Sequence, residues 1–323
     1  MFKQDARLNL HGVKQEYTNN FFDTFSPVVT WFTTRLVLYL YIIIGWNTCQ
    51  VDFVLAFNQS NIEFDMYMEI TQIIETKGGS RTMHILKLVK DIYGQRQGYR
   101  VWNQNLTKGI EEIGLRQHRV GDCMLYQCEV IFIVYVDSGI FSSPSDAETN
   151  QTITEISAKF GIEDQWNLDD YTRVNMESPP SGGIYILKPH LIEQITQDTK
   201  SLQRALPRSM TDKYSMILWR NLSATPLNHW LYYRSFFGKL NFPKNCIKCD
   251  ISYVTQKFAQ LYEDPLCTHG AAIEHLALYF RGNWDNELIL DPNSAESFEV
   301  YAGADFCGNW YTPIAINDPL TSK

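Results

Sequence analysis

The chain has 323 residues, of which 45% are hydrophobic and 20% charged, and its formal net charge at pH 7 is −8. This length and composition exclude a disordered or fibrous protein, and they leave room for two or three subdomains with cores of their own. The acidity excludes a protein that coats nucleic acid through uniform positive charge, so contact with a phosphate backbone would depend on local basic segments.

The first strongly apolar segment, residues 36–44, predicts a buried helix rather than a membrane span. It is far shorter than the roughly 20 residues that cross a bilayer. Thr33 or Thr34 is a suitable N-cap for it. The first residues are polar and of mixed charge, which is not the pattern of a secretory signal. We therefore expect no association with a membrane.

Residues 45–57 predict a short strand that ends on Asp52, with a small residue and an aromatic residue, Ala56 and Phe57, close behind it. Further along, residues 81–120 hold eight Lys and Arg against three Asp and Glu, a net charge of +5. Residues 196–281 also carry +5. Either segment could be an ordinary solvated surface or a face that meets nucleic acid, and the charge alone leaves both interpretations open.

Residues 130–141 consist of two apolar runs, rich in β-branched and aromatic residues, on either side of Asp137. They predict a strand, a tight turn at residues 137–139 and a second strand. The aspartate needs solvent, a hydrogen-bond network or a metal ion, because an unpaired buried charge is very costly. By itself it fits an ordinary solvated turn. Together with Asp52 it gives two strand-end carboxylates, which a two-metal phosphoryl-transfer site requires.

The later elements are less distinct. Residues 178–183 are rich in Ser, Pro and Gly and predict a hairpin turn. Helical periodicity is weak in residues 201–219 and clearer in residues 272–281, where four apolar side chains share a face: Ile273, Leu276, Tyr279 and Phe280. The odd number of cysteines, seven, suits a reducing compartment, so we expect a cytoplasmic or nuclear protein.

Motifs along nearly the whole chain resemble the reverse transcriptase of copia-type retrotransposons. The most specific is the Phe-x-Thr-Phe-Ser-Pro-Val-Val pattern from Phe22 to Val29. The Gln-Leu-Asp-Val-Lys-x-Ala-Phe motif of the family is similar to residues 50–57, and its Tyr-Val-Asp-Asp motif is similar to the hairpin at Asp137. The other matches fall in the same order as in the family, at residues 5–12, 67–69, 92–102, 233–240 and 250–253.

The resemblance implies an α+β fold, the right-hand polymerase, with an antiparallel palm sheet that carries both aspartates, truncated fingers and a helical thumb. Residues 1–165 would form partial fingers and palm, and residues 166–285 the end of the palm and a helical thumb or connection. Residues 286–323 resemble the start of an RNase H-like domain, which we interpret as a truncated fragment consisting of an unpaired strand and a loop.

The resemblance also implies a function, RNA-directed DNA polymerase. Its partners would be an RNA or DNA template-primer and deoxynucleoside triphosphates. Asp52 and Asp137 would hold two Mg²⁺ or Mn²⁺ ions. Phe57 would stand beneath the sugar as a steric gate, unless it only packs at the start of a helix. Arg7 would approach the triphosphate, and Gln97 would steady the nucleotide.

Two positions depart from the family pattern. Ser138 replaces the second aspartate of the hairpin, and Gly303 replaces the first catalytic aspartate of the RNase H-like domain. Serine offers only a neutral oxygen, so simultaneous binding of two metal ions is doubtful. An alternative therefore stays open, in which the chain is an inactive retrotransposon remnant that acts at most as a nucleic-acid-binding or protein-binding module.

Overall fold

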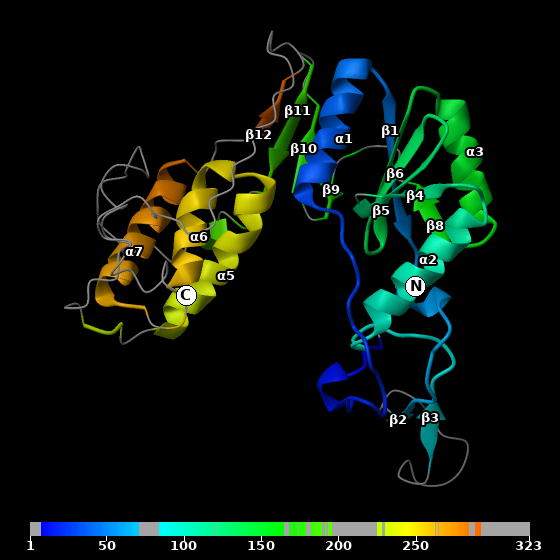
Figure 1. Cartoon of the computed structure of the whole chain (residues 1–323), viewed down its shortest axis with the longest axis horizontal. Coiled ribbons are helices and arrows are strands. Elements are labelled where there is room, and N and C mark those ends of the chain that lie inside the picture. The colour runs from blue at the N-terminus through cyan, green and yellow to red at the C-terminus, as the bar shows by residue number, and fades with distance from the viewer. Residues whose placement is uncertain are drawn as a thin grey trace, which may run out of the picture. The chain divides into compact units, whose positions relative to one another are not determined.

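The computed structural model divides the chain into two compact units, residues 1–172 and 173–323, and each is described by itself (Figure 1). The structure describes residues 8–70, 84–119, 121–164, 168, 170–172, 174–178, 182–188, 191, 193–195, 225–227, 230–261, 263, 265–283 and 288–291.

A six-stranded sheet forms the centre of the first unit, in the order β4-β5-β6-β7-β1-β8. All of its neighbouring strands pair in the antiparallel direction. The strands are β1 (Asn47–Phe53), β4 (Arg116–His118), β5 (Gly121–Gln127), β6 (Val130–Tyr135), β7 (Ser138–Ser143) and β8 (Ile162–Asp164). This confirms the mixture of helices and antiparallel sheet that the sequence predicted.

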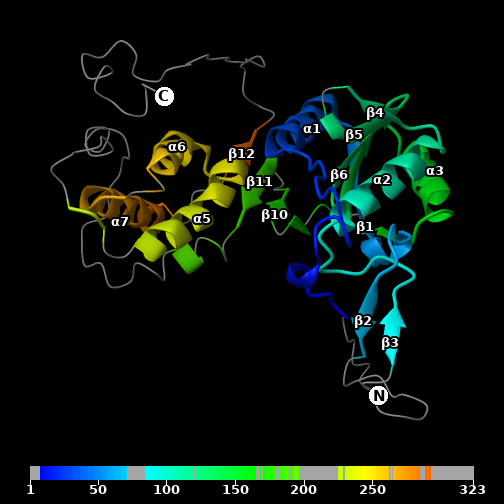
Figure 2. The ribbon, with the colours of Figure 1, turned by 60° about the horizontal axis from the view of Figure 1, so that its bottom comes forward.

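Two helices, α2 (Gly98–Glu111) and α3 (Asp146–Ser157), cover one face of this sheet and lie next to each other in both views (Figures 1 and 2). Strand side chains alternate between faces, and this face carries the largest apolar residues of the central strands, among them Phe53 and Phe132. They pack against Trp102 of α2 and Ile156 of α3 in one buried cluster. Burial of this face fixes the strand register, because a shift by one residue would expose the whole set.

Helix α1 (Trp31–Ile44) contains the apolar segment that the sequence analysis assigned to a buried helix. Its N-cap is Thr30, whose hydroxyl accepts a hydrogen bond from the Thr33 N–H, so the predicted caps were three or four residues too late. Only part of its surface is buried, since Ile43 and Ile44 are more than half exposed. The prediction of a buried helix was therefore correct for one side only.

Short elements complete the first unit. They are the 3₁₀ turns η1 (Gly12–Lys14) and η2 (Ala56–Gln59), the strand β9 (Asp170–Tyr171), and a separate antiparallel ribbon of β2 (Tyr67–Glu69) and β3 (Ile85–Lys87).

The second unit contains antiparallel strands and a group of helices. Strands β10 (Val174–Glu177), β11 (Ile184–Leu187) and β12 (Leu288–Leu290) pair in that order. The helices are α5 (Trp230–Cys246), α6 (Ser252–Gln260) and α7 (Cys267–Gly282), with the 3₁₀ turn η4 (Cys249–Ile251) before α6. The three helices share a buried cluster and lie close together in both views (Figures 1 and 2).

Two sequence-based predictions for this unit are confirmed by the structure. The hairpin around residues 178–183 is confirmed by the pairing of β10 with β11. In α7, Ile273, Leu276 and Phe280 are buried together, as the periodicity indicated. The unpaired strand expected at residues 298–306 lies outside the described residues, while a short strand before it, β12, pairs with β11. Residues 201–219 and almost all of the RNase H-like fragment lie outside the described residues. Across the described part of the chain, no helix combines the length and apolar character needed to cross a membrane.

Candidate active site

Asp52 lies one residue before the end of β1, on the sheet face opposite to α2 and α3. In the pairing of β1 with β7, its direct partner is Ser138. The Ser138 hydroxyl donates a hydrogen bond to Asp52 Oδ1, with 2.6 Å between the two oxygens. Directly opposite residues of neighbouring strands share one face, so the side chain that replaces the second hairpin aspartate points at the first carboxylate.

Asp137 occupies the turn between β6 and β7, next to the same end of β1. Its backbone carbonyl accepts a hydrogen bond from the Phe53 N–H, with 2.7 Å between nitrogen and oxygen. Since Phe53 directly follows Asp52, the backbones of the two aspartates lie side by side at the end of the neighbouring strands β1 and β7. Both side chains are partly exposed. The structure thus brings together two acids that are 85 positions apart in the sequence.

The turn at Asp137 starts one residue earlier than the sequence indicated. Tyr135 pairs with Ser138, so the turn consists of Val136 and Asp137, and Ser138 already belongs to β7. The φ angle of Val136 is +60°, which is unusual for a β-branched residue. The indole N–H of Trp102 donates a hydrogen bond to the Val136 carbonyl, with 2.6 Å between nitrogen and oxygen.

The two aspartates offer ligands that suit a hard cation. Mg²⁺ and Mn²⁺ prefer carboxylate oxygens and take water or phosphate oxygens in the remaining positions. Both residues are partly exposed at the end of β1 and in the turn before β7, so water and a phosphate can reach them. Within the described residues, no group of three or more His, Cys, Asp and Glu side chains comes together. The two carboxylates therefore suit a cation that is bound by fewer than three such side chains of the described residues.

Phe57, the sequence-based candidate for a steric gate, lies in η2 and is only 3% exposed. Its ring meets two others edge-on, that of Tyr93 at 4.6 Å and that of Tyr99 at 4.9 Å between centroids. Tyr99 is 50% exposed. The accessible surface over Phe57 is thus provided in part by Tyr99, which the sequence analysis did not single out.

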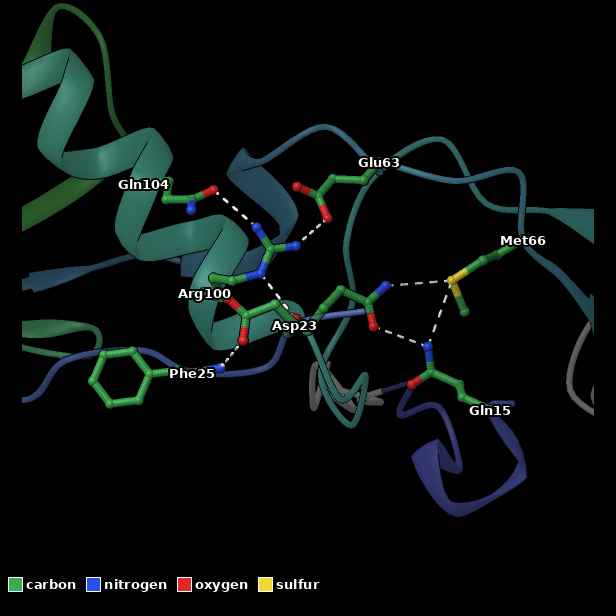
Figure 3. Close-up of polar contacts among 8 residues, drawn as sticks. Gln15, Asp23, Phe25, Glu63, Met66, Arg100 and Gln104 are labelled. Carbon is green, nitrogen blue, oxygen red and sulfur yellow. Dashed lines mark hydrogen bonds and ion pairs between the residues drawn. The ribbon is translucent and has the colours of Figure 1, made fainter. Parts of the chain in front are cut away.

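Gln97 is completely buried at the start of α2. Its side-chain oxygen accepts a hydrogen bond from Gln15 Nε2 at 2.9 Å, and its own Nε2 donates to Met66 Sδ at 3.5 Å. Figure 3 shows Gln15 and Met66 pointing into this small cluster. The side chain expected to steady a nucleotide is therefore engaged inside the protein, where it joins three distant segments.

Arg100 is a second connecting residue at the start of α2. Its guanidinium forms an ion pair with Glu63 and donates to the backbone carbonyl of Asp23 at 2.9 Å and to Gln104 at 3.1 Å (Figure 3). It thereby joins the segment around Asp23 and the segment around Glu63 to α2. Sequence reasoning counted Arg100 only as one charge of a basic segment, because nothing in the local pattern shows these partners.

A buried carboxyl group, that of Asp91, lies near this ion pair. The residue has no exposed surface, and neither of its carboxyl oxygens has a hydrogen-bond partner among the described residues. Burial, and then the negative charge of Glu63, raise the pKa of Asp91 to about 7, while Arg100 acts in the opposite direction. The sequence analysis also missed this group, since its burial depends on tertiary packing. Arg7 and Gly303, two positions it did single out, lie outside the described residues.

The sequence of this chain also matches a known protein family and several known proteins. A family model described as "Reverse transcriptase (RNA-dependent DNA polymerase)" matches residues 1–209. The chain is 24% identical over 317 residues to the retrovirus-related Pol polyprotein from transposon RE1 of Arabidopsis thaliana, an alignment that covers 97% of this chain and 21% of the relative.

Two further relatives come from other organisms. The Pol polyprotein from transposon TNT 1-94 of Nicotiana tabacum is 21% identical over 320 residues, 96% of this chain and 24% of the relative. A putative transposon Ty5-1 protein of Saccharomyces cerevisiae is 20% identical over 226 residues, 68% of this chain and 72% of the relative. The chain thus spans about a fifth to a quarter of the length of the two polyproteins.

Proposed function

We propose, starting from the fact that this chain belongs to the reverse transcriptase (RNA-dependent DNA polymerase) family, that it copies RNA into DNA at a site formed by Asp52 and Asp137. The observation that carries the proposal is the hydrogen bond between the Phe53 N–H and the Asp137 carbonyl, which holds the two aspartates side by side. The matches to retrotransposon Pol polyproteins support the same activity.

In this proposal Asp52 and Asp137 hold divalent cations, Mg²⁺ or Mn²⁺. Bound there, the metal would lower the pKa of the primer 3′-hydroxyl and neutralise charge on the triphosphate as pyrophosphate leaves. The chain's own residues bring the acids together on rigid backbone and keep them open to solvent. Ser138 replaces a possible third carboxylate, so we propose weaker metal binding and slower nucleotide transfer than a site with three carboxylates would give.

The substrate would approach from the segments around these acids. We assign the incoming sugar to the surface over Phe57, so that Tyr99 has to turn aside when the nucleotide binds. Arg7 would contact the triphosphate, and Gln97 would act indirectly, by fixing the start of α2. The six-stranded sheet would be the palm, and the N-terminal segments would belong to the fingers. Residues 166–285 would form the end of the palm and a thumb or connection, followed by residues 286–323, which resemble the start of an RNase H-like domain.

The hydrogen bond from Ser138 to Asp52 also favours a second candidate function. A hydroxyl that occupies Asp52 Oδ1 at 2.6 Å competes with a cation for that oxygen. A chain that binds no metal at Asp52 and Asp137 would be an inactive remnant that retains only a surface for nucleic acid or protein.

Primer extension on an RNA template, with Mg²⁺ or Mn²⁺, separates the two functions. We expect slow extension by the natural chain and its loss, by at least about 100-fold, in Asp52→Asn and in Asp137→Asn, because each removes a charged ligand from the metal. Asp122→Asn, at an exposed position of β5, controls for the substitution itself.

Ser138→Asp tests the explanation for slow extension. It should raise both the rate of extension and the affinity for Mn²⁺ measured by calorimetry, since it adds a negative oxygen ligand beside Asp52. Extension that persists in both Asn variants, or no extension and no Mn²⁺ binding even with Ser138→Asp, would contradict the polymerase proposal.

A further inference from the structure

We propose that Trp102 is a positioning residue for Asp137, because its indole N–H holds the turn that presents this carboxylate in a strained conformation. The inference rests on the proposed function of Asp137. It concerns how the site is kept in shape, and it assigns a further role to a side chain that also packs in the buried core.

The strain is located at Val136. Of the two turn residues only Val136 has a positive φ, +60°, in a region where the Cβ atom of an ordinary residue crowds its own backbone. A two-residue hairpin turn of this pattern favours glycine at its first position. Valine is one of the least suitable residues there, since both of its γ-methyl groups add to the crowding. Surrounding contacts must therefore maintain this conformation.

Two hydrogen bonds supply such contacts, one for each carbonyl of the turn. The Val136 carbonyl accepts from Trp102 Nε1 at 2.6 Å, and the Asp137 carbonyl accepts from the Phe53 N–H at 2.7 Å. The second bond belongs to the backbone and is independent of side-chain identity. The first depends entirely on the one polar atom of an otherwise apolar ring.

The Trp102 ring is itself firmly held. It is only 1% exposed, and its ring centroid lies 5.3 Å from that of Phe53 and 5.8 Å from that of Phe160, with both contacts edge-on. A large ring packed on two sides cannot rotate without disturbing the core. Its N–H therefore points at the turn in a fixed direction, so α2 determines the orientation of the peptide between Val136 and Asp137.

Loss of the Trp102 N–H would release the turn. A Val136 residue released from the hydrogen bond relaxes toward negative φ, and the peptide plane that precedes Asp137 rotates. The carboxylate then spends only part of its time beside Asp52. A site with few ligands loses affinity for a cation when one of them, here Asp137, is misplaced. The packing of the folded core stays the same.

Trp102→Phe removes the donor and keeps an aromatic ring in the core. Its effect on the turn can be measured by NMR in the full chain, with ¹³C at the carbonyl of valine and ¹⁵N in aspartate. The sequence contains only two Val-Asp pairs, residues 51–52 and 136–137, so an HNCO spectrum shows two signals. We expect the Val136 carbonyl signal to move upfield in the variant, while the Val51 carbonyl signal stays in place. Trp46→Phe, at a partly buried position before β1, is the matched control.

A double-mutant cycle then separates positioning from plain packing. Trp102→Phe should weaken Mn²⁺ binding about tenfold, the population ratio expected when a strained residue at positive φ is released. In the background of Val136→Gly, where the turn needs no external support, the same substitution should change Mn²⁺ affinity less than about twofold. A purely structural role of Trp102 would give equal losses in both backgrounds.

An unchanged Val136 carbonyl signal in Trp102→Phe would overturn the inference, and so would equal losses of Mn²⁺ affinity in the natural chain and in the Val136→Gly background. Failure of the proposed function has a different signature. If the natural chain binds no Mn²⁺ at all, the metal site is wrong, while the carbonyl signal still decides whether Trp102 holds the turn.

Discussion

Asp91 is a single residue with a strong effect on how stability depends on pH. A buried carboxyl group with a pKa of about 7 stays protonated in the folded protein at pH values where the unfolded chain has already lost that proton, because the ordinary value is near 4. The stabilisation from this raised pKa is complete below about pH 4 and is lost as the pH rises through 7. The groups that act on Asp91 are Glu63 and Arg100.

Asp91→Asn should therefore flatten the dependence of stability on pH. Between pH 5 and pH 8 we expect the natural chain to lose on the order of 2 kcal/mol more free energy of unfolding than the variant does. Urea denaturation at the two pH values measures this, and Asp122→Asn serves as the control at an exposed position. Equal losses in the natural chain and in Asp91→Asn would show that Asp91 is not a buried acid.

Residue-level chemistry could be inferred from the sequence only where the signal was local. Asp52 and Asp137 were found because Asp52 stands at the end of a predicted short strand and Asp137 directly follows an apolar run. The burial of Asp91 could not be found this way, since its immediate neighbours form no pattern that distinguishes a buried acid from a solvated one. The same holds for Gln97, whose partner Gln15 is 82 positions away.

Helix α2 is the element that connects the core to the turn at Asp137, through Trp102. Its close approach to the residues after α3 depends on Gly109, where an added Cβ would overlap the ring of Phe160. Phe160 also contacts Trp102. Bulk added at Gly109 therefore affects the ring that supports the turn.

Gly109→Ala should destabilise the chain by about 1–3 kcal/mol, because overpacking of the core outweighs the gain in helix propensity. Gly238→Ala is the matched control, since it also lies inside a helix, α5, where an added Cβ meets no atom of the described residues within 4 Å. That change should stabilise its helix by about 0.5–1 kcal/mol. Chemical denaturation measures both, and a neutral or stabilising effect of Gly109→Ala would contradict the packing described for α2.

Elements with strong periodicity were predicted well, and their ends less well. The hairpin of β6 and β7 and the buried face of α7 follow from apolar patterns that act over a few residues. The position of the turn was missed by one residue, because valine at positive φ contradicts local preference and is held by Trp102, which is distant in the sequence. The partner of β12 could not be predicted either, since pairing between strands far apart in the sequence leaves no local mark.

At the scale of the whole molecule, the chain consists of two compact units with separate buried clusters. The length and composition predicted several subdomains, and the order of motifs along the chain predicted the family, which the family model confirms. The net charge of −8 gave no indication of a polymerase. Charge summed over a chain does not show how acidic and basic residues are distributed along it. In the proposed site the two acids and the basic segments would serve opposite needs.

The central claim is that Asp52 and Asp137 share a cation. The most direct test is a Mn²⁺ titration of the chain labelled at its two Val-Asp pairs, because paramagnetic Mn²⁺ broadens the amide signals of nearby residues. We expect both signals to disappear together and Mg²⁺ to restore them. We also expect Asp137→Asn to raise about tenfold the Mn²⁺ concentration needed to broaden the Asp52 signal. Signals that disappear at different concentrations, or an Asp52 signal unaffected by Asp137→Asn, would contradict this claim.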